Sequence, residues 1–503
     1  EVIATGQADG LIPVEPQDGL SINDDNQSNV GNYDDPFRYT GKVTRVRLDP
    51  LEPAAIKANQ SNTSAKNPPN FIVILSDDQG WGTTSIPYDP QIKQSKSDFF
   101  HTPNMQRIAA SGMRFTQAYS AHTNCSPSRA ALLTGISPAA LHFSDIVGRN
   151  TGKYYIGNRL TPPAHVNQLD SATVTIPERL KAHNSAYMAA HFGKWHLNGG
   201  GPLAHGFDIG DGSTGNREGG LKSNLPDDPK RAFSITRSSV NWMQKQVSRG
   251  NPFYLQVSHY ATHLGYQSQP HTIARLESRQ EGKRHNNIQY GGMIEDLDTS
   301  LGQLLDAVEH LGILDNTYII YTSDNGTYPT TDPANINGPL RGSKATLWEA
   351  GVRVPLMISG PGITAGSLSR QKAIGYDILP TICDILGIHN LDERVEGGSL
   401  IPALHQTGSV IRPRNELYFH WPHYQHQKLS KPDSTIVDGD YKLHYFWESG
   451  ELQLYDLSKD LGEANNLVNT YPEKAAQLNT KLKQYLKDIK AQLPTTNRAY
   501  TPE

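Results

Sequence analysis

Carboxylate and amide side chains directly follow two apolar segments that have the composition of buried strands. "FIVIL" (71–75) and "YIIYTS" (318–323) are the two segments, and each runs into a pair of oxygen-bearing side chains. Strands of a doubly wound sheet place their carboxyl ends at one edge, so we expect the two pairs to meet there. Asp and Asn also favour turns, which is the alternative interpretation of both pairs. The candidate residues are Asp77, Asp78, Asp324 and Asn325.

Oxygen donors alone favour a hard divalent cation over zinc, which prefers nitrogen and sulfur ligands. Calcium and magnesium both bind carboxylates, and calcium also tolerates an amide oxygen and irregular geometry. The sequence therefore predicts one calcium ion at this edge of the sheet.

The segment "NCSPSRAALLTG" (124–135) contains one of only two cysteines in the chain. Ser126 is a possible helix cap and Pro127 a suitable first helical residue, which predicts that Cys125 lies just outside a helix N-terminus. A thiol at that position usually has a lowered pKa. A soft thiolate nevertheless matches a calcium site poorly. The other cysteine, Cys383, lies in an apolar helical pattern and is predicted to be buried in the core.

Short apolar segments alternate with helical patterns from Asn70 onward, which is typical of an α/β fold. We expect a large, mostly parallel sheet sandwiched by helices, followed by a smaller C-terminal antiparallel sheet with a terminal helix. Between the strands, "TPNMQRIAASG" predicts a short helix capped by Thr102. The predicted strands of the large sheet are 71–75, 186–192, 253–258, 318–323 and 355–360.

Three regions are expected along the chain. Residues 1–66 are rich in Asp, Asn, Gln, Ser and Pro and are interpreted as an N-terminal arm. Residues 67–397 form the α/β domain, and residues 398–503 form the C-terminal subdomain.

Charge and hydropathy exclude two classes of partner. The formal net charge is -4, with basic residues scattered along the 503-residue chain, so a nucleic-acid partner is not expected. The apolar runs are far shorter than the roughly 20 residues that a membrane-spanning helix needs.

The motif Cys125-Ser126-Pro127-Ser128-Arg129, followed by "AALLTG", resembles the signature of the formylglycine-dependent sulfatases of the alkaline-phosphatase-like superfamily. The segments "LSDDQGWG", "GKWHL", "HGFD", "TSDNG", "LRGSKATLWEAGVRVP" and "DGDYKL" follow the same order as in that family. The resemblance covers the chain from about Asn70 to the C-terminal helix, and bacterial polysaccharide sulfatases match the overall pattern best. It implies that a formylglycine-generating or anaerobic sulfatase-maturing enzyme oxidises Cys125, which replaces sulfur by oxygen and removes the mismatch with calcium.

The same resemblance implies a role for each catalytic side chain. Hydrated formylglycine at position 125 attacks sulfur while also binding the metal, and an arginine one helical turn later orients it. Two lysines bind the sulfate, and the histidine of "GKWHL" polarises the diol or accepts the proton that opens the sulfate hemiacetal. His263 protonates the leaving oxygen, with His259 as the competing choice. The implied catalytic residues are Cys125, Arg129, Lys194, His196, His263 and Lys344, and the implied metal ligands are Asp77, Asp78, Cys125, Asp324 and Asn325.

A sulfated carbohydrate is the expected substrate, with an algal polysaccharide or oligosaccharide such as carrageenan or ulvan favoured over a glycosaminoglycan. A phosphodiester or phosphonate monoester hydrolase is the alternative enzyme, and a catalytically inactive sugar-binding homologue is the alternative outside the enzymes. We expect a secreted or periplasmic protein. Candidate sugar contacts, in part from the aromatic loop "FHWPHYQHQ" (419–427), are His205, Arg149, Arg237, His420 and His423.

Overall fold

The computed structural model describes residues 67–501 except 149–156, 220–224, 329–335 and 426–429. The chain from Asn67 onward forms one compact unit. The predicted N-terminal arm, including its strand-like stretch, lies outside the described residues.

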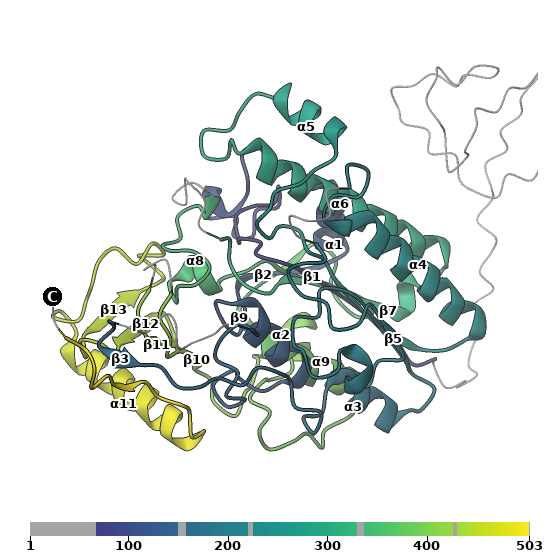
Figure 1. Cartoon of the computed structure of the whole chain (residues 1–503). Helices are drawn as coiled ribbons and strands as arrows, with labels where there is room; N and C mark the ends of the chain where they lie inside the picture. The colour runs from purple at the N-terminus through teal and green to yellow at the C-terminus, as the bar shows by residue number, and fades with distance from the viewer. Residues whose placement is uncertain (1–66, 149–156, 220–224, 329–335, 426–429, 502–503) are drawn as a thin grey trace, which may run out of the picture. The chain divides into compact units, whose positions relative to one another are not determined.

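An eight-stranded sheet forms the centre of the compact unit, in the order β5-β4-β6-β1-β7-β8-β2-β9 (Figure 1). All neighbouring strands run parallel except β8, which is antiparallel to both of its neighbours. The predicted mostly parallel sheet is thus confirmed. The strands are β1 (Asn70–Ser76), β2 (Gly112–Tyr119), β4 (Met188–Gly193), β5 (Ile209–Gly210), β6 (Phe253–Ser258), β7 (Thr317–Ser323), β8 (Leu356–Ser359) and β9 (Ser367–Ile374).

Helices cover both faces of this sheet because alternate side chains of each buried strand enter different cores. In β1, Phe71, Val73 and Leu75 belong to one hydrophobic cluster. Ile72 and Ile74 belong to the cluster on the opposite face. The first cluster is closed by α2 (Cys125–Thr134), α3 (Ile176–His183) and α9 (Ile378–Ile385), and the second by α1 (Pro103–Ser111), α4 (Ala232–Arg249) and α6 (Ile288–His310).

The C-terminal part contains a second, antiparallel sheet in the order β10-β11-β12-β13. Leucines and a tyrosine of α11 (Pro472–Asp488) pack with this sheet in one hydrophobic cluster. The predicted small sheet with a terminal helix is therefore confirmed. Its strands are β10 (Leu417–Trp421), β11 (Asp433–Asp438), β12 (Tyr441–Phe446) and β13 (Leu452–Asp456).

The short helix α1 is capped differently from the sequence prediction. Thr102 makes no capping hydrogen bond, because its hydroxyl contacts Ser85. The carboxylate of Asp298, on α6, instead accepts the backbone N–H groups of Asn104 and Met105 at 3.0 and 2.7 Å. Thr102 thus occupies the predicted N-cap position, with Pro103 as the first helical residue, but the backbone N–H groups of the first turn are bound by Asp298 rather than by the Thr102 hydroxyl.

Buried charges join the C-terminal sheet to the short helix α8 (Glu349–Val352). Lys442, on β12, lies 3.0 Å from Glu349 and 3.1 Å from Glu463. His444, two residues later, has Nδ1 2.9 Å from Asp433 and Nε2 3.0 Å from Glu463. A ring with carboxylates at both nitrogens donates from both, so His444 is an imidazolium. Burial acts to lower the pKa of His444, but these two carboxylates raise it above its ordinary value.

We expect His444→Gln to lower the free energy of unfolding by about 3–5 kcal/mol, because it removes one charge from a buried ionic network. The raised pKa makes this contribution complete below the unfolded-state value of about 6.5, and it is lost as the pH rises through the folded-state pKa. Urea unfolding at several pH values measures the difference. The exposed His271→Gln is the control, and a pH-independent deficit in His444→Gln would contradict the imidazolium assignment.

Candidate active site

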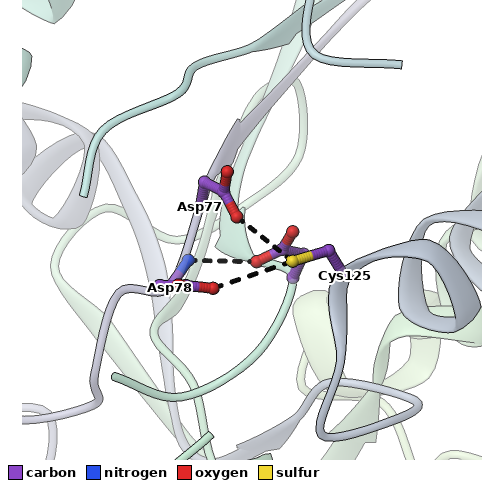
Figure 2. Close-up of side chains that lie close together, drawn as sticks. Asp77, Asp78 and Cys125 are labelled. Carbon is purple, nitrogen blue, oxygen red and sulfur yellow. Dashed lines mark hydrogen bonds between the residues drawn. The ribbon is translucent and has the colours of Figure 1, made fainter. Parts of the chain in front are cut away.

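The predicted oxygen ligands meet at the carboxyl edge of the large sheet. Strands β1 and β7 pair in parallel with Ser76 opposite Ser323, so the residues after each strand begin at the same level. Ligand atoms of Asp77, Asp78 and Asp324 lie within 4.8 Å of one another and of Cys125 Sγ. Figure 2 shows Asp77 and Asp78, which directly follow β1, directed at the cysteine. All of these side chains are buried.

The donor set fits a hard cation. Asp78 Oδ2 and Asn325 Oδ1 are buried, and neither makes a hydrogen bond within the described part of the chain. An orphaned buried oxygen costs free energy, which a bound cation offsets. Carboxylate and amide oxygens are the ligands that calcium and magnesium prefer. The Asp78 backbone is held in a left-handed conformation with φ of 60°, and its N–H donates to Asp324 Oδ1 at 3.1 Å.

Cys125 is the first residue of α2, and the structure places Asn124 at the N-cap. The predicted Ser126 cap is wrong, because the Ser126 hydroxyl accepts the N–H of Val147 at 3.2 Å. Cys125 Sγ lies 3.5 Å from Asp77 Oδ1 and 3.1 Å from Lys344 Nζ. Burial raises the pKa of the Cys125 thiol far above its ordinary value, despite the nearby lysines. The unmodified residue is therefore a neutral buried thiol rather than a thiolate nucleophile.

Two lysines from different parts of the chain form ion pairs with the carboxylates that follow β1. Lys194 follows β4, and its Nζ lies 2.6 Å from Asp77 Oδ2. Lys344 reaches the cluster from the segment before α8 and forms an ion pair with Asp78. Burial acts to raise the pKa of Asp77, but Lys194, His263 and Arg129 hold it well below its usual range. Both ammonium groups thus lie where they can also contact a bound anion.

Arg129 lies on the first turns of α2 and binds the third carboxylate. Its Nε and Nη2 lie 2.9 and 2.7 Å from Asp324 Oδ2, and its Nη1 donates to the Lys194 carbonyl at 2.6 Å. Burial and the neighbouring Asp77 raise the pKa of Asp324 to about 6, against the effect of Arg129. Arg129 therefore connects the strand-end acids to the loop that carries Lys194.

Two histidines complete the cluster. His196 is buried with φ of 57°, and its Nδ1 makes no hydrogen bond to a described residue. Burial and the adjacent Lys194 lower the pKa of His196 well below its ordinary value. His263 Nε2 lies 3.8 Å from Asp78 Oδ2, whereas the His259 ring is fully buried with both nitrogens unpaired among the described residues. The structure thus brings His263, and not His259, to the carboxylates.

The candidate sugar contacts do not gather at this cluster. His205 is buried against Trp195 and its Nε2 contacts the Gly199 carbonyl. The ring nitrogens of His420 contact Ser434 and the Gln492 carbonyl. In the structure both rings are therefore buried and hydrogen-bonded within the fold.

Two of the remaining candidates lie in the described part of the chain, in different places. His423 is buried, with Nε2 2.8 Å from the Ser144 hydroxyl. Arg237 is exposed on α4. Arg149 lies outside the described residues.

Lys230 is a buried cation that the sequence did not reveal. It is 2% exposed and precedes α4 in a polar segment without a recognisable motif. Burial lowers the pKa of Lys230 to about 8, while Asp77 and Asp78 favour its charged form. Only the folded chain shows that this lysine lies within the electrostatic field of the site.

Comparisons with known proteins agree with this geometry. The family model for sulfatases matches residues 69–388, and that for the C-terminal region of N-sulphoglucosamine sulphohydrolase matches residues 343–492. A sulfatase of Formosa agariphila is 28% identical, with 88% of this chain and 92% of the relative covered. The human N-acetylgalactosamine-6-sulfatase is 32% identical over 70% of this chain and 68% of its own.

A solved structure shares the fold. The crystal structure of Ps i-CgsB in complex with k-i-k-neocarrahexaose superposes with a TM-score of 0.68 at 23% identity, covering 84% of this chain and 93% of that chain. Among the described residues, no helix is both long and apolar enough to cross a bilayer. The family match extends over more than half of the chain and includes every residue of the cluster around Cys125. The protein is therefore an enzyme of the sulfatase family, which hydrolyses sulfate esters.

Proposed function

We propose that the protein removes sulfate from a sulfated carbohydrate, with formylglycine at position 125 as the nucleophile and one calcium ion as cofactor. The observation that carries this proposal is the enclosure of Cys125 by carboxylates and ammonium groups. A neutral buried thiol has no evident role there, whereas an oxygen nucleophile suits both the acids and a cation.

The calcium ligands in this proposal are the strand-end oxygens, completed by an oxygen of residue 125. When bound, calcium supplies Lewis-acid polarisation of a sulfate oxygen and charge stabilisation that needs no proton transfer. The unpaired Asp78 Oδ2 and Asn325 Oδ1 support this assignment. The proposed ligands are Asp77, Asp78, Asp324, Asn325 and the modified Cys125.

The surrounding side chains bind and orient the reacting groups. Oxidised residue 125 offers, as its hydrate, a hydroxyl oxygen to the sulfur atom of the ester. Lys194 and Lys344 neutralise the sulfate oxygens as charge develops. Arg129, already fixed by Asp324, keeps the start of α2 aligned with the sheet edge.

Two histidines move protons in this scheme. The Nδ1 of His196 is unpaired and neutral, so it accepts the proton whose loss expels sulfate from residue 125. His263 donates a proton to the leaving oxygen from Nε2. Burial lowers the pKa of His263 to about 4, and Asp78 opposes this shift. The ring is therefore neutral before substrate binds, and the negative charge of an arriving sulfate ester favours the protonated form that donates from Nε2.

The carbohydrate substrate is supported by the relatives, which include an N-acetylgalactosamine-6-sulfatase and a structure in complex with a neocarrahexaose. We favour an algal polysaccharide or oligosaccharide over a glycosaminoglycan, acted on by a secreted or periplasmic enzyme. Modification by a formylglycine-generating or anaerobic sulfatase-maturing enzyme is part of the proposal.

Mass spectrometry of the tryptic peptide 115–129 tests the modification directly. We expect the mass change for conversion of CH2SH to CHO in protein from a maturation-competent host, together with sulfate release from carrageenan or glycosaminoglycan oligosaccharides. Protein made without a maturation enzyme is the control and should show cysteine without turnover. Full sulfate release from protein carrying only cysteine contradicts the proposal. Phosphodiester cleavage without sulfate release supports the phosphohydrolase alternative instead.

A further inference from the structure

The buried side chain of Lys230 extends from a stretch of backbone with unusual dihedral angles. The residues Lys230 and Arg231 have φ of 56° and 54°, in the turn Pro229–Arg231 that leads into α4. Side chains with a Cβ rarely adopt this left-handed region, and such strain persists where the surrounding structure requires it. Two consecutive residues of this kind precede α4, and the Lys230 side chain is 2% exposed.

The buried ammonium has no acidic partner. Its Nζ donates to the Leu264 carbonyl at 2.9 Å, and the described residues place no carboxylate within ion-pair distance of it. The adjacent Asp228 is engaged elsewhere, because its Oδ1 accepts the N–H groups of Phe233 and Ser234 at the start of α4. An ammonium buried against a single neutral acceptor is unfavourable for folding alone. The burial of this ammonium therefore needs a reason other than stability, and its contact with the Leu264 carbonyl supplies one.

The Leu264 carbonyl also faces His263. The Nδ1 of His263 lies 3.4 Å from this oxygen, to which the Lys230 ammonium also donates. A carbonyl oxygen only accepts, so the contact orients the ring through an N–H at Nδ1. The opposite nitrogen, Nε2, is the one that lies 3.8 Å from Asp78 Oδ2. In the protonated ring both nitrogens carry a hydrogen, so a ring held at Nδ1 can donate from Nε2 toward the site.

We infer that Lys230 is a positioning residue of the sulfatase reaction: through the Leu264 carbonyl, its ammonium holds His263 with Nε2 directed at the leaving oxygen of the ester. This inference rests on the proposed function, in which His263 protonates that oxygen. The hydrogen bond of the Lys230 ammonium goes to the Leu264 carbonyl and not to residue 125.

Leaving-group dependence tests the inference, because good leaving groups depart without protonation and poor ones do not. Matured Lys230→Met is assayed on aryl sulfates of graded leaving-group pKa and on a sugar sulfate. We expect kcat to fall about 10- to 100-fold on the poorest leaving groups and less than about 3-fold on nitrophenyl sulfate, with KM nearly unchanged. Lys245→Met, on the exposed face of α4, is the matched control.

A double-mutant cycle then asks whether Lys230 acts through His263. In a His263→Gln background, Lys230→Met should cost less than about a further 2-fold in kcat, since coupled residues are not additive. Three results overturn the inference. They are the full additional loss of kcat in the double variant, a uniform fall in kcat across the substrate series, and a rise in KM with kcat unchanged. Lys230→Arg keeps the positive charge but moves the N–H groups away from the Leu264 carbonyl. If Lys230→Met does not fold, the same kinetic comparison is made with Lys230→Arg. A wild-type rate in His263→Gln alone refutes the acid role of His263 itself.

Discussion

Cys125→Ala is expected to reduce sulfate release by about 10⁴-fold or more. Alanine lacks the thiol group from which the proposed maturation makes the nucleophile. Alanine has neither sulfur nor hydroxyl and is smaller than cysteine, so the lysines and carboxylates around it remain. Substrate affinity should therefore be retained. Steady-state kinetics of sulfate release and calorimetric titration of the variant with an oligosaccharide substrate measure the two quantities separately.

The second cysteine provides the control for this experiment. Cys383 is a buried free thiol in the core formed with α2, α3 and α9, as its apolar surroundings predict. Cys383→Ala should keep kcat and lower only thermal stability, since it removes one packed atom remote from the carboxylates. Near-normal turnover in Cys125→Ala would show that the nucleophile lies elsewhere.

Asp324→Asn is expected to lower kcat/KM by at least about 10³-fold, because in the proposed site this one carboxylate binds both the cation and Arg129. The neutral amide removes one ligand charge and leaves the buried guanidinium without its closest acid. Wild-type protein should lose activity and thermal stability on chelation and regain both when calcium is added. The variant should show a much smaller stability response to calcium, and differential scanning fluorimetry measures this without reference to turnover.

Asp315→Asn is the matched control, since Asp315 is exposed just before β7 whereas Asp324 follows its end. It removes the same charge at the opposite end of β7, without changing the site. An unchanged calcium response in Asp324→Asn would exclude this carboxylate as a ligand, even if its activity were lost through Arg129.

The sequence predicts those site residues that follow directly from strand order. Parallel strands end at the same edge of a sheet, so the residues after β1 and β7 must lie near each other there. The proximity of Asp77 and Asp324 therefore follows from the alternation of strand and helix patterns and from the composition of the two strands. The resemblance to sulfatases adds Arg129 and Lys344, whose positions depend on loops that periodicity does not describe.

Other features depend on contacts between distant segments. The Asp298 cap of α1 and the hydroxyl contact of Ser126 join residues far apart in sequence, and the burial of His205 depends on how its own segment folds back against Trp195. Lys230 is the clearest case, because a solitary lysine in a polar stretch has no signal until the fold places it beside Leu264. Side-chain type alone cannot separate a core histidine from a ligand-binding one.

The complete burial of Cys125 sets an order of events for the proposed maturation. With no exposed surface at this residue, a separate maturation enzyme cannot reach it once α2 has packed against the sheet. In the proposed scheme, the oxidation of Cys125 therefore competes with folding of the newly made chain. We expect the active fraction of a preparation to be fixed at synthesis: slower folding or more abundant maturation enzyme should increase it, whereas later treatment of the folded protein should not.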